Sequence, residues 1–334
     1  MKASFVRRYG GNDVIEYGDV PKPQPGAGQL LVKVHAAGVN PVDYKIRDGA
    51  MKMLVPMPFP LVLGSEFSGV VEQVGAGVSE FRPGDAVFAR MAIRHIGAYA
   101  EYAVVDAVHA ARKPARLSHA EAAAVPLAAL TAWQALFERG GLKAGQTVLI
   151  HGGSGGVGTF AIQMARHIGA KVATTVGTRN AMLVRSLGAN IVIDYKSQRF
   201  EDCVRDCDLV LDTQGGDIQR RSFSVLKRGG TLVSIAGMPD RQVAKSFKLN
   251  PILGWLFHFM NRKSRGLARV SGTRFEYLFM QPSGEQLRKI AALLDSEKIR
   301  PIVDKIFSLA QTDAALAYCE AGHASGKVVV EVQP

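Results

Sequence analysis

Short apolar runs separated by proline and glycine characterise the first third of the chain. Examples are residues 29–35, 67–74 and 86–89. Apolar runs of this length, bounded by turn-forming residues, are typical of β-strands. We therefore expect residues 1 to about 120 to form an irregular, barrel-like β domain.

From about Glu121 the hydrophobic pattern changes to helical segments that alternate with short apolar strands. The expected elements, in chain order, are a helix to Arg139, strand 147–150, helix 157–168, strand 171–176, helix 180–187, and strands 190–193, 208–212 and 230–236. Strands that alternate with helices in this way form a parallel sheet with helices on both faces. The pattern thus predicts an α/β domain with a doubly wound parallel sheet of the Rossmann type.

The pattern is less regular beyond this series. A basic, partly aromatic stretch at 239–274 precedes an expected edge strand at 275–280 and a helix at 285–296. The end of the chain again resembles strands, finishing with Lys327-Val328-Val329-Val330-Glu331-Val332. We expect this C-terminal segment to return to the first domain.

The bulk properties agree with a two-domain globular protein, since 334 residues exceed the size at which a single core stops growing. The N-terminus lacks the apolar run of a signal peptide, and no uncharged apolar stretch has membrane-spanning length, so a cytoplasmic location is expected. Three cysteines argue against a disulfide framework, and Cys203 and Cys207 are expected to share one helix.

The formal net charge is +12, and the segment from Pro239 to Met280 carries half of it, with eight basic residues against two acidic ones. A basic chain suits a polyanionic partner, either nucleic acid or the phosphates of a cofactor. No recognised nucleic-acid-binding motif accompanies the charge, so no specific nucleic-acid partner is expected.

A glycine-rich turn provides the most specific motif. Gly153-Ser154-Gly155-Gly156-Val157-Gly158 follows an expected strand and opens an expected helix, which is the context of a dinucleotide fingerprint. Glycines allow a tight turn and let the pyrophosphate approach the N–H groups at the helix N-terminus. We therefore expect Ser154, Gly155, Gly156 and Val157 to contact a dinucleotide.

The end of the next strand indicates which dinucleotide binds. NAD-binding folds usually place Asp or Glu there to hold the ribose 2′-OH. This chain has Val176-Gly177-Thr178-Arg179 instead. Arg179 is suited to pair with a 2′-phosphate, with Thr175 and Thr178 donating hydrogen bonds beside Gly177. NADPH is therefore favoured over NADH.

Five motifs together resemble the medium-chain dehydrogenase/reductase superfamily, in its zinc-independent quinone oxidoreductase and enone reductase branch. They are Ala37-Gly38-Val39-Asn40-Pro41-Val42-Asp43, Gly64-Ser65-Glu66-Phe67-Ser68-Gly69-Val70-Val71, the glycine turn, Asp212-Thr213-Gln214-Gly215-Gly216 and Gly326-Lys327-Val328-Val329. The resemblance implies a GroES-like, irregular β-barrel catalytic domain from residues 1–123 and 283–334, and a Rossmann NADP-binding domain from residues 124–282. It also implies an active site in the cleft between the domains and a homodimer paired through strand 275–280.

The zinc ligands of related enzymes are missing. Zinc-dependent relatives carry Cys in the first motif and a His-Glu pair in the second, whereas this chain has Asn40-Pro41 and Ser65-Glu66, and Leu127 near the third position. Glu66 alone is insufficient for a tetrahedral zinc site, and its expected role is a partly buried carboxylate paired with a nearby cation. No metal is therefore expected.

The resemblance also implies roles for individual residues. Asn40 is expected near the nicotinamide as a catalytic and cofactor-binding residue. Lys45 is expected as the main catalytic donor, Tyr44 as a catalytic residue in the pocket wall and Arg47 as an anion anchor. The remaining expected cofactor contacts are Thr131, Tyr195 on the adenosine side, and Ala236 with Gly237 at the nicotinamide end. His95 and His151 are weaker proton-donor candidates, because an isolated histidine is more often a structural residue.

Residues 251–260 form an apolar run that is followed by the basic residues Arg262, Lys263 and Arg265. Ten residues are too few to span a membrane. Three interpretations remain for 251–265: a helix packed on its own protein, which is favoured, a pocket lid, or an interfacial helix that makes a weak contact with a membrane surface.

The function favoured by these observations is NADPH-dependent, zinc-independent reduction of quinones or α,β-unsaturated carbonyl compounds. The alternative from another class is a cofactor-binding protein with a basic nucleic-acid-binding or structural role. A third interpretation, an alcohol or aldehyde dehydrogenase, is disfavoured because the zinc ligands are missing.

Overall fold

The computed structural model describes residues 1–237 and 239–333, and for residues 246, 253 and 258 it describes the backbone alone. The chain forms two compact units, unit 1 from residues 1–130 and 281–334 and unit 2 from residues 131–280. The family resemblance implies a first boundary at 123/124. Helix α3 (Pro126–Trp133) runs from the end of unit 1 into the start of unit 2.

Unit 1 is built around the long strand β3, which pairs with β5, β7 and β16. A smaller sheet has the order β2-β1-β4, and the larger one has the order β15-β16-β3-β5-β6-β8. The strands are β1 (Lys2–Val6), β2 (Ile15–Asp19), β3 (Gln29–Val39), β4 (Leu61–Val62), β5 (Glu66–Val74), β6 (Ala86–Arg90), β7 (Tyr102–Asp106), β8 (Ala110–Arg112), β15 (Val303–Ser308) and β16 (Lys327–Glu331). The helices are α1 (Pro41–Arg47), α2 (His119–Ala123), α11 (Gly284–Asp295) and α12 (Thr312–Glu320).

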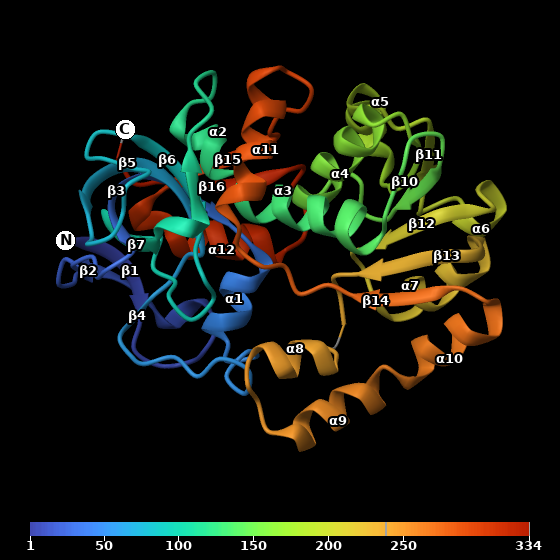
Figure 1. Cartoon of the computed structure of the whole chain (residues 1–334), viewed down its shortest axis with the longest axis horizontal. Helices are drawn as coiled ribbons and strands as arrows, with labels where there is room; N and C mark the ends of the chain where they lie inside the picture. Colours follow the sequence, from blue (N-terminus) through green and yellow to red (C-terminus); the bar gives the residue numbers. More distant parts are fainter. Residues whose placement is uncertain (238, 334) are drawn as a thin grey trace. The chain divides into compact units, whose positions relative to one another are not determined.

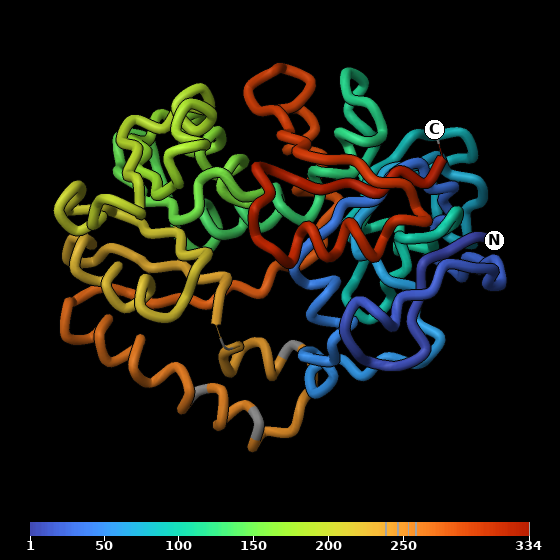
Figure 2. Tube along the Cα trace, turned by 180° about the vertical axis from the view of Figure 1, so that it is seen from behind, coloured from blue at the N-terminus to red at the C-terminus, as the bar shows by residue number. Residues whose placement is uncertain are grey.

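The C-terminal strand completes the N-terminal sheet. Residues 328–331 of β16 run antiparallel to residues 36–39 of β3, and Figure 2 shows the end of the chain returning to the N-terminal strands. This pairing brings Lys327 next to the first two motifs, although almost 300 residues separate it from them in the sequence.

Unit 2 contains a six-stranded sheet with the order β11-β10-β9-β12-β13-β14, and all neighbouring strands are parallel. Counted from the first strand of the unit, this is the 3-2-1-4-5-6 order of a Rossmann fold. The strands are β9 (Thr147–Ile150), β10 (Lys171–Val176), β11 (Ile191–Asp194), β12 (Cys207–Asp212), β13 (Leu226–Ser234) and β14 (Arg274–Tyr277). The predicted fold class is confirmed.

Helices cover both faces of this sheet, with α4 and α5 on one side and α7 and α10 on the other (Figure 1). The helices of the unit are α4 (Gly156–His167), α5 (Ala181–Leu187), α6 (Phe200–Cys203), α7 (Gly216–Ser222), α8 (Arg241–Ser246), α9 (Pro251–Met260) and α10 (Arg262–Ser271). No helix of the described residues is long and apolar enough to cross a membrane.

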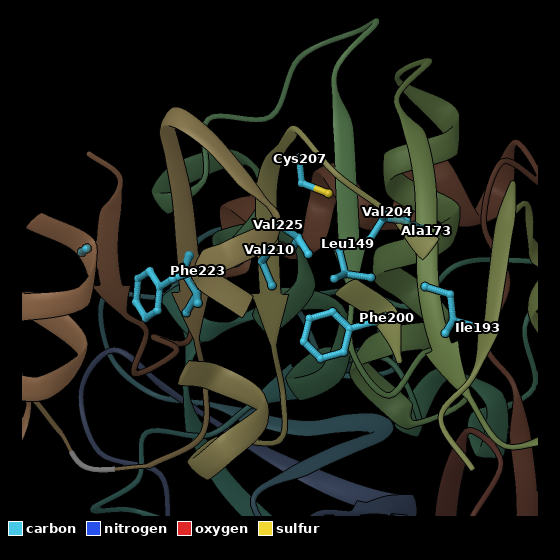
Figure 3. Close-up of a cluster of buried hydrophobic side chains, with 11 residues drawn as sticks. Leu149, Ala173, Ile193, Phe200, Val204, Cys207, Val210, Phe223 and Val225 are labelled. Carbon is cyan, nitrogen blue, oxygen red and sulfur yellow. The ribbon is translucent and has the colours of Figure 1, made fainter. Parts of the chain in front are cut away.

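A cluster of buried apolar side chains packs one face of the parallel sheet (Figure 3). Its members come from neighbouring strands and from the segments that cover them, and include Leu149, Ala173, Val210, Phe200, Phe223 and Ala268. Alternate residues of a strand point to opposite faces, so each strand contributes a residue to each side. The packing fixes the carboxyl ends of the strands, where the glycine turn begins.

Two local predictions differ from the structure. Cys203 ends α6 and Cys207 begins β12, so the two cysteines do not share a helix. Asp206, between them, has a φ of 56°, a left-handed conformation that is incompatible with a continuing helix. The strand expected at 230–236 spans Leu226–Ser234, which leaves Ala236 and Gly237 beyond its end.

Candidate functional site

The glycine-rich turn connects β9 to α4 between β10 and β12, where the strand order reverses. Ligands of open α/β sheets bind at this point, outside the carboxyl ends of the strands. Two glycines have no room for a side chain. A Cβ at Gly153 would lie 2.0 Å from Thr174 Oγ1, and a Cβ at Gly158 would lie 2.3 Å from the Gly152 carbonyl oxygen. The close packing around Gly153 and Gly158 therefore keeps the turn tight.

The predicted phosphate-binding residues are accessible. All four residues, Ser154, Gly155, Gly156 and Val157, are partly exposed. Gly155 is the N-cap residue of α4 and has no side chain that could cap the helix. The first N–H groups of a helix have no partner within the helix. Together with the helix dipole, they form a site that fits a phosphate group.

The buried carboxylate of Asp212 organises the loop that follows β12. It accepts four hydrogen bonds, from the N–H groups of Gln214 (2.9 Å) and Gly215 (2.8 Å), the Ser234 hydroxyl (2.7 Å) and Gln219 Nε2 (3.0 Å). The adjacent Thr213 hydroxyl donates to the His151 carbonyl oxygen at 2.8 Å. In the sequence this segment is recognisable only as a family motif, although its aspartate stands at the end of a buried strand and shortly before two glycines.

His151 is a buried structural residue beside the turn. Its Nε2 lies 3.0 Å from the Ser222 hydroxyl, which itself donates to the Ile218 carbonyl oxygen, and its Nδ1 lies 3.1 Å from Thr175 Oγ1. This network assigns the ring proton to Nε2. Burial lowers the pKa of His151 to about 4, so the ring is neutral at pH 7.

The residues predicted to contact the 2′-phosphate include one buried and two exposed side chains. Thr175 is buried, and its hydroxyl oxygen accepts the Gly152 N–H at 3.2 Å, so this side chain supports the turn from inside. Thr178 and Arg179 are exposed on the short turn Thr178–Asn180. Tyr195 is 60% exposed, and its ring lies against the backbone of Gly177.

The structure adds an acidic residue that the sequence analysis did not place here. Parallel pairing of β10 and β11 sets Asp194 opposite Val176, and the Asp194 carboxylate accepts a hydrogen bond from the Thr178 hydroxyl. This hydrogen bond is the main cause that lowers the Asp194 pKa. A carboxylate therefore lies near Arg179, but it comes from the neighbouring strand.

In unit 1, Asn40 is the N-cap residue of α1 and is only 2% exposed. Its side-chain amide donates to Glu66 Oε1 at 2.6 Å. The Lys327 ammonium binds the same carboxylate oxygen at 2.8 Å and also donates to the Asn40 amide oxygen and to the Val39 carbonyl oxygen at 2.8 Å. The other Glu66 oxygen accepts the Leu127 N–H at 2.6 Å. The expectation of a cation beside Glu66 is confirmed, and the cation is Lys327.

Gly38 makes this network possible. A Cβ at residue 38 would lie 2.3 Å from Glu66 Oε1 and 2.5 Å from the Ala123 carbonyl oxygen. Only glycine leaves space for the carboxylate. The network is fully buried, since Glu66 is 0% and Lys327 4% exposed.

The other predicted residues of α1 differ in exposure. Lys45 is exposed and Tyr44 is half-buried, and burial is the main cause that raises the Tyr44 pKa. Arg47 is 2% exposed and forms ion pairs with Asp48 at 2.7 Å and Glu320 at 3.0 Å. The expectation that Arg47 anchors an anionic ligand is therefore wrong, because its guanidinium is buried against carboxylates of its own chain.

Comparison with known proteins identifies the family. A model described as alcohol dehydrogenase GroES-like domain matches residues 26–115, and one described as zinc-binding dehydrogenase matches residues 187–330. The mitochondrial NAD(P)H oxidoreductase RTN4IP1 of Danio rerio is 35% identical, over 99% of this chain and 91% of that protein. The chloroplastic NADPH-dependent alkenal/one oxidoreductase of Arabidopsis thaliana is 34% identical, over 99% of this chain and 79% of that protein. The structure of the Coxiella burnetii quinone oxidoreductase is 33% identical with a TM-score of 0.86, and the match covers 100% of this chain and 99% of that one.

The chain belongs to the medium-chain dehydrogenase/reductase superfamily. Its relatives are quinone and enone oxidoreductases, so the chain is an oxidoreductase of this superfamily. Two of these relatives carry organelle names, and the cytoplasmic location of this member stays a prediction.

The residues at the zinc-ligand positions of the superfamily do not suit a metal in this member. Asn40, Ser65 and Leu127 stand there in place of Cys and His ligands, and Lys327 already binds Glu66. Among the described residues, no group of three or more His, Cys, Asp or Glu side chains is arranged to hold a metal ion. A catalytic zinc ion requires three protein ligands of the nitrogen, sulfur or carboxylate type, and this donor set does not provide them.

Proposed function

We propose that this medium-chain dehydrogenase/reductase is an NADPH-dependent reductase of quinones or α,β-unsaturated carbonyl compounds that works without zinc. The observation that carries the proposal is the Lys327 ammonium on the buried Glu66 carboxylate. A fixed cation of the chain neutralises Glu66, which follows Ser65, the residue at the position where zinc-dependent relatives carry His. Such an enzyme has no Lewis acid to polarise an isolated carbonyl group.

A conjugated acceptor does not need a Lewis acid. Hydride addition to an enone or quinone spreads the developing charge onto a remote oxygen, which hydrogen-bond donors can stabilise. When bound, NADPH supplies the hydride, and the acceptor takes up one proton to complete a two-electron reduction. The chain must therefore hold the cofactor, orient the acceptor and provide a donor to the oxygen.

Cofactor binding is assigned to the turn of unit 2 and its neighbours. Ser154, Gly155, Gly156 and Val157 would hold the pyrophosphate through backbone N–H groups. Arg179 would bind the 2′-phosphate, because it is exposed beside Gly177, where NAD-dependent proteins carry an acid. The further proposed contacts are Thr131, Thr178, Tyr195, Ala236 and Gly237, while Thr175 positions the turn from within.

Three residues of unit 1 are assigned to the reaction. Lys45 is the proposed hydrogen-bond and proton donor, because its ammonium is exposed on α1. The Tyr44 phenol is protonated at neutral pH, as an unperturbed phenol already is, and burial raises its pKa further. The ring would form part of the pocket wall. Asn40 has both polar atoms bound to Glu66 and Lys327, so we assign it a positioning role at the start of α1.

The deciding experiment is steady-state oxidation of NADPH and of NADH with a quinone, an enone and a saturated aldehyde, each with and without a chelator. We expect turnover of the conjugated acceptors with NADPH, unchanged by the chelator. Turnover of the aldehyde alone, or loss of activity with the chelator, would contradict the proposal. NADPH binding without turnover of any acceptor would favour a cofactor-binding protein.

The cofactor preference has its own test. Arg179→Ala should lower kcat/KM for NADPH by about 10- to 100-fold, the value of a hydrogen-bonded charge, and leave NADH almost unchanged. Arg185→Ala, an exposed arginine on α5, is the matched control. If Asp194→Asn instead lowers kcat/KM for NADH and Arg179→Ala has no effect on NADPH, then Asp194 holds a ribose hydroxyl and the preference is for NADH.

The resemblance to the medium-chain dehydrogenase/reductase superfamily leads us to infer a homodimer. β14 is the last strand of the parallel sheet and pairs with β13 alone among the described residues, so its outer edge is suited to antiparallel pairing with a second copy. Light scattering with size-exclusion chromatography would detect the dimer, and a proline at Phe275 should dissociate it. A monomeric wild-type protein would overturn this inference.

A further inference from the structure

Helix α9 exposes most of the apolar side chains that the structure describes on it. Five of them are between 43% and 73% exposed: Ile252, Trp255, Leu256, Phe259 and Met260. Their spacing of three and four residues places them in one stripe along the helix. The opposite side holds Gly254, where a Cβ would lie 3.5 Å from Ala244 of α8. A surface helix of a globular protein normally turns its apolar stripe toward the core, so α9 has the reverse arrangement.

The surroundings of this stripe are strongly basic. From Arg241 to Phe275 the chain contains no acidic residue and eight basic ones: Arg241, Lys245, Lys248, Arg262, Lys263, Arg265, Arg269 and Arg274. Two of these cations lie over the exposed rings. The Arg241 guanidinium is 4.9 Å from the centre of the Trp255 ring, and the Arg262 guanidinium is 3.9 Å from the centre of the Phe259 ring. Positive charge therefore borders the apolar stripe directly.

A surface hollow of about 420 Å³ lies where α8 meets α9. Arg241, Lys245, Asn250 and Pro251 are among its lining residues. The hollow combines two cations with an amide at the N-terminal end of α9. These groups are the usual partners of a phosphate.

The protein holds this region in a fixed place. Asn261, between α9 and α10, donates to the Pro239 carbonyl oxygen at 2.9 Å. Ser264 of α10 donates to Gln219 at 2.8 Å, and Ala268 belongs to the core cluster of the parallel sheet. Helix α10 follows α9 along the same side of unit 2 in both views (Figures 1 and 2). The stripe is thus presented by a rigid support.

We propose that the α8–α10 surface, residues 241–271, docks on an anionic lipid bilayer. A helix with tryptophan and other apolar side chains on one side and flanking lysine and arginine lies in the plane of a membrane interface, with its apolar side among the acyl chains. The cations attract the negative surface, and the hollow between α8 and α9 accepts a lipid phosphate.

A second copy of the chain does not fit this surface. In a two-fold dimer the same patch meets itself, which would set the seven cations of residues 241–271 against seven cations with no carboxylate between them. Like charges across an interface oppose association. The charge therefore favours an anionic bilayer over self-association.

The test is flotation of the full chain with phosphatidylcholine vesicles, with and without phosphatidylglycerol, at low and at high salt. We expect binding to the anionic vesicles alone, weakened by salt because the Debye length shortens. Trp255→Ser combined with Phe259→Ser should lower the vesicle affinity at least about tenfold. Arg262→Gln combined with Lys263→Gln should lower it about thirtyfold, as expected for two surface cations.

Matched controls separate these effects from general changes of the surface. Met182→Ser with Arg185→Gln removes an exposed apolar residue and a cation from α5, and should leave vesicle binding unchanged. Tryptophan fluorescence should shift to the blue on vesicle addition, and this shift should be lost in Trp255→Phe. The fold of each variant is checked by circular dichroism.

Three results would overturn the proposal. The first is no binding to anionic vesicles at low salt, and the second is equal binding by the stripe variants and the wild type. The third is a change of oligomeric state in the Trp255→Ser, Phe259→Ser variant, which would identify the stripe as a contact between copies. None of these measurements depends on the cofactor or the acceptor.

Discussion

Glu66 and Lys327 show how a single contact sets the chemistry available to the chain. Both side chains are buried, and their charges are 2.8 Å apart. A buried ion pair gains little net stability, because desolvation offsets the attraction, but removing one partner leaves an isolated buried charge. The pair is therefore more important for neutralising the buried Glu66 carboxylate than for its own free energy.

Replacing Lys327 should test this view. We expect Lys327→Met to lower the free energy of unfolding by about 3–5 kcal/mol, because Glu66 is left without its counterion. The double variant Lys327→Met, Glu66→Gln should recover part of the loss, since no buried charge remains. Urea unfolding of the two single variants and the double variant gives the coupling energy.

Lys298→Met is the control, because this lysine is exposed and belongs to the same unit. Its effect should stay within about 0.5 kcal/mol. Additive losses in the double variant would show that Glu66 and Lys327 do not act as a pair.

At the scale of elements, the β9–α4 turn depends on contacts with β10 and with the loop after β12. Gly153 lies against Thr174 of β10, and the Thr213 hydroxyl holds the His151 carbonyl oxygen. Each contact brings the turn close to the sheet, where the first N–H groups of α4 face the carboxyl ends of the strands. Cofactor binding should therefore be sensitive to the spacing between the turn and α4.

Gly158→Ala should disturb that spacing. Its Cβ would lie 2.3 Å from the Gly152 carbonyl oxygen and 2.7 Å from Gly153 Cα, and backbone atoms cannot move aside as a side chain can. We expect a stability loss of about 1–3 kcal/mol and a higher dissociation constant for NADPH, measured by fluorescence titration. Gly266→Ala in α10 meets no atom within 4 Å and should instead stabilise the helix by up to about 1 kcal/mol. Unchanged NADPH affinity in Gly158→Ala would show that the turn is not the phosphate site.

At the scale of the whole molecule, the half-buried His119 and the buried His151 couple the stability of the two units to pH. Burial lowers the pKa of His119 in unit 1 and of His151 in unit 2 from 6.5 to about 4. Below about pH 6.5 the unfolded chain binds protons at these residues, while the folded chain stays neutral until about pH 4. Stability is therefore complete above pH 6.5 and falls as the pH drops toward 4.

Urea unfolding followed from neutral pH down to about pH 4 should show this fall. The variants His119→Gln and His151→Gln should each flatten the slope. Asp43 acts in the opposite sense, because burial raises its pKa, and Glu201 contributes only at lower pH, since Arg221 holds its pKa at about 2. A slope unchanged in both histidine variants would contradict the assignment.

Several features could be predicted from the sequence because they depend on local order. The alternation of apolar strands and helices predicts the Rossmann sheet, and Gly153 to Gly158 in that context predict the turn. Asn40, Ser65 and Leu127 predict the loss of zinc ligands by residue type alone. The missed positions involve residues that no local pattern connects, such as Asp194 beside Thr178 and Arg47 against Glu320.

Three features follow from the amino-acid sequence alone: the order of the elements, the glycine-rich turn between a strand and a helix, and the lack of Cys and His at the zinc positions of the family. Each is expressed by neighbouring residues or by residue type. Only the tertiary structure decided that Lys327 neutralises Glu66, that Asp194 holds Thr178 and that α9 turns its apolar side outward. These three depend on strand pairing between distant segments and on which face of a helix is covered. Hydrophobic periodicity gives the position of a stripe on a helix, but only packing against other elements decides whether that stripe is buried.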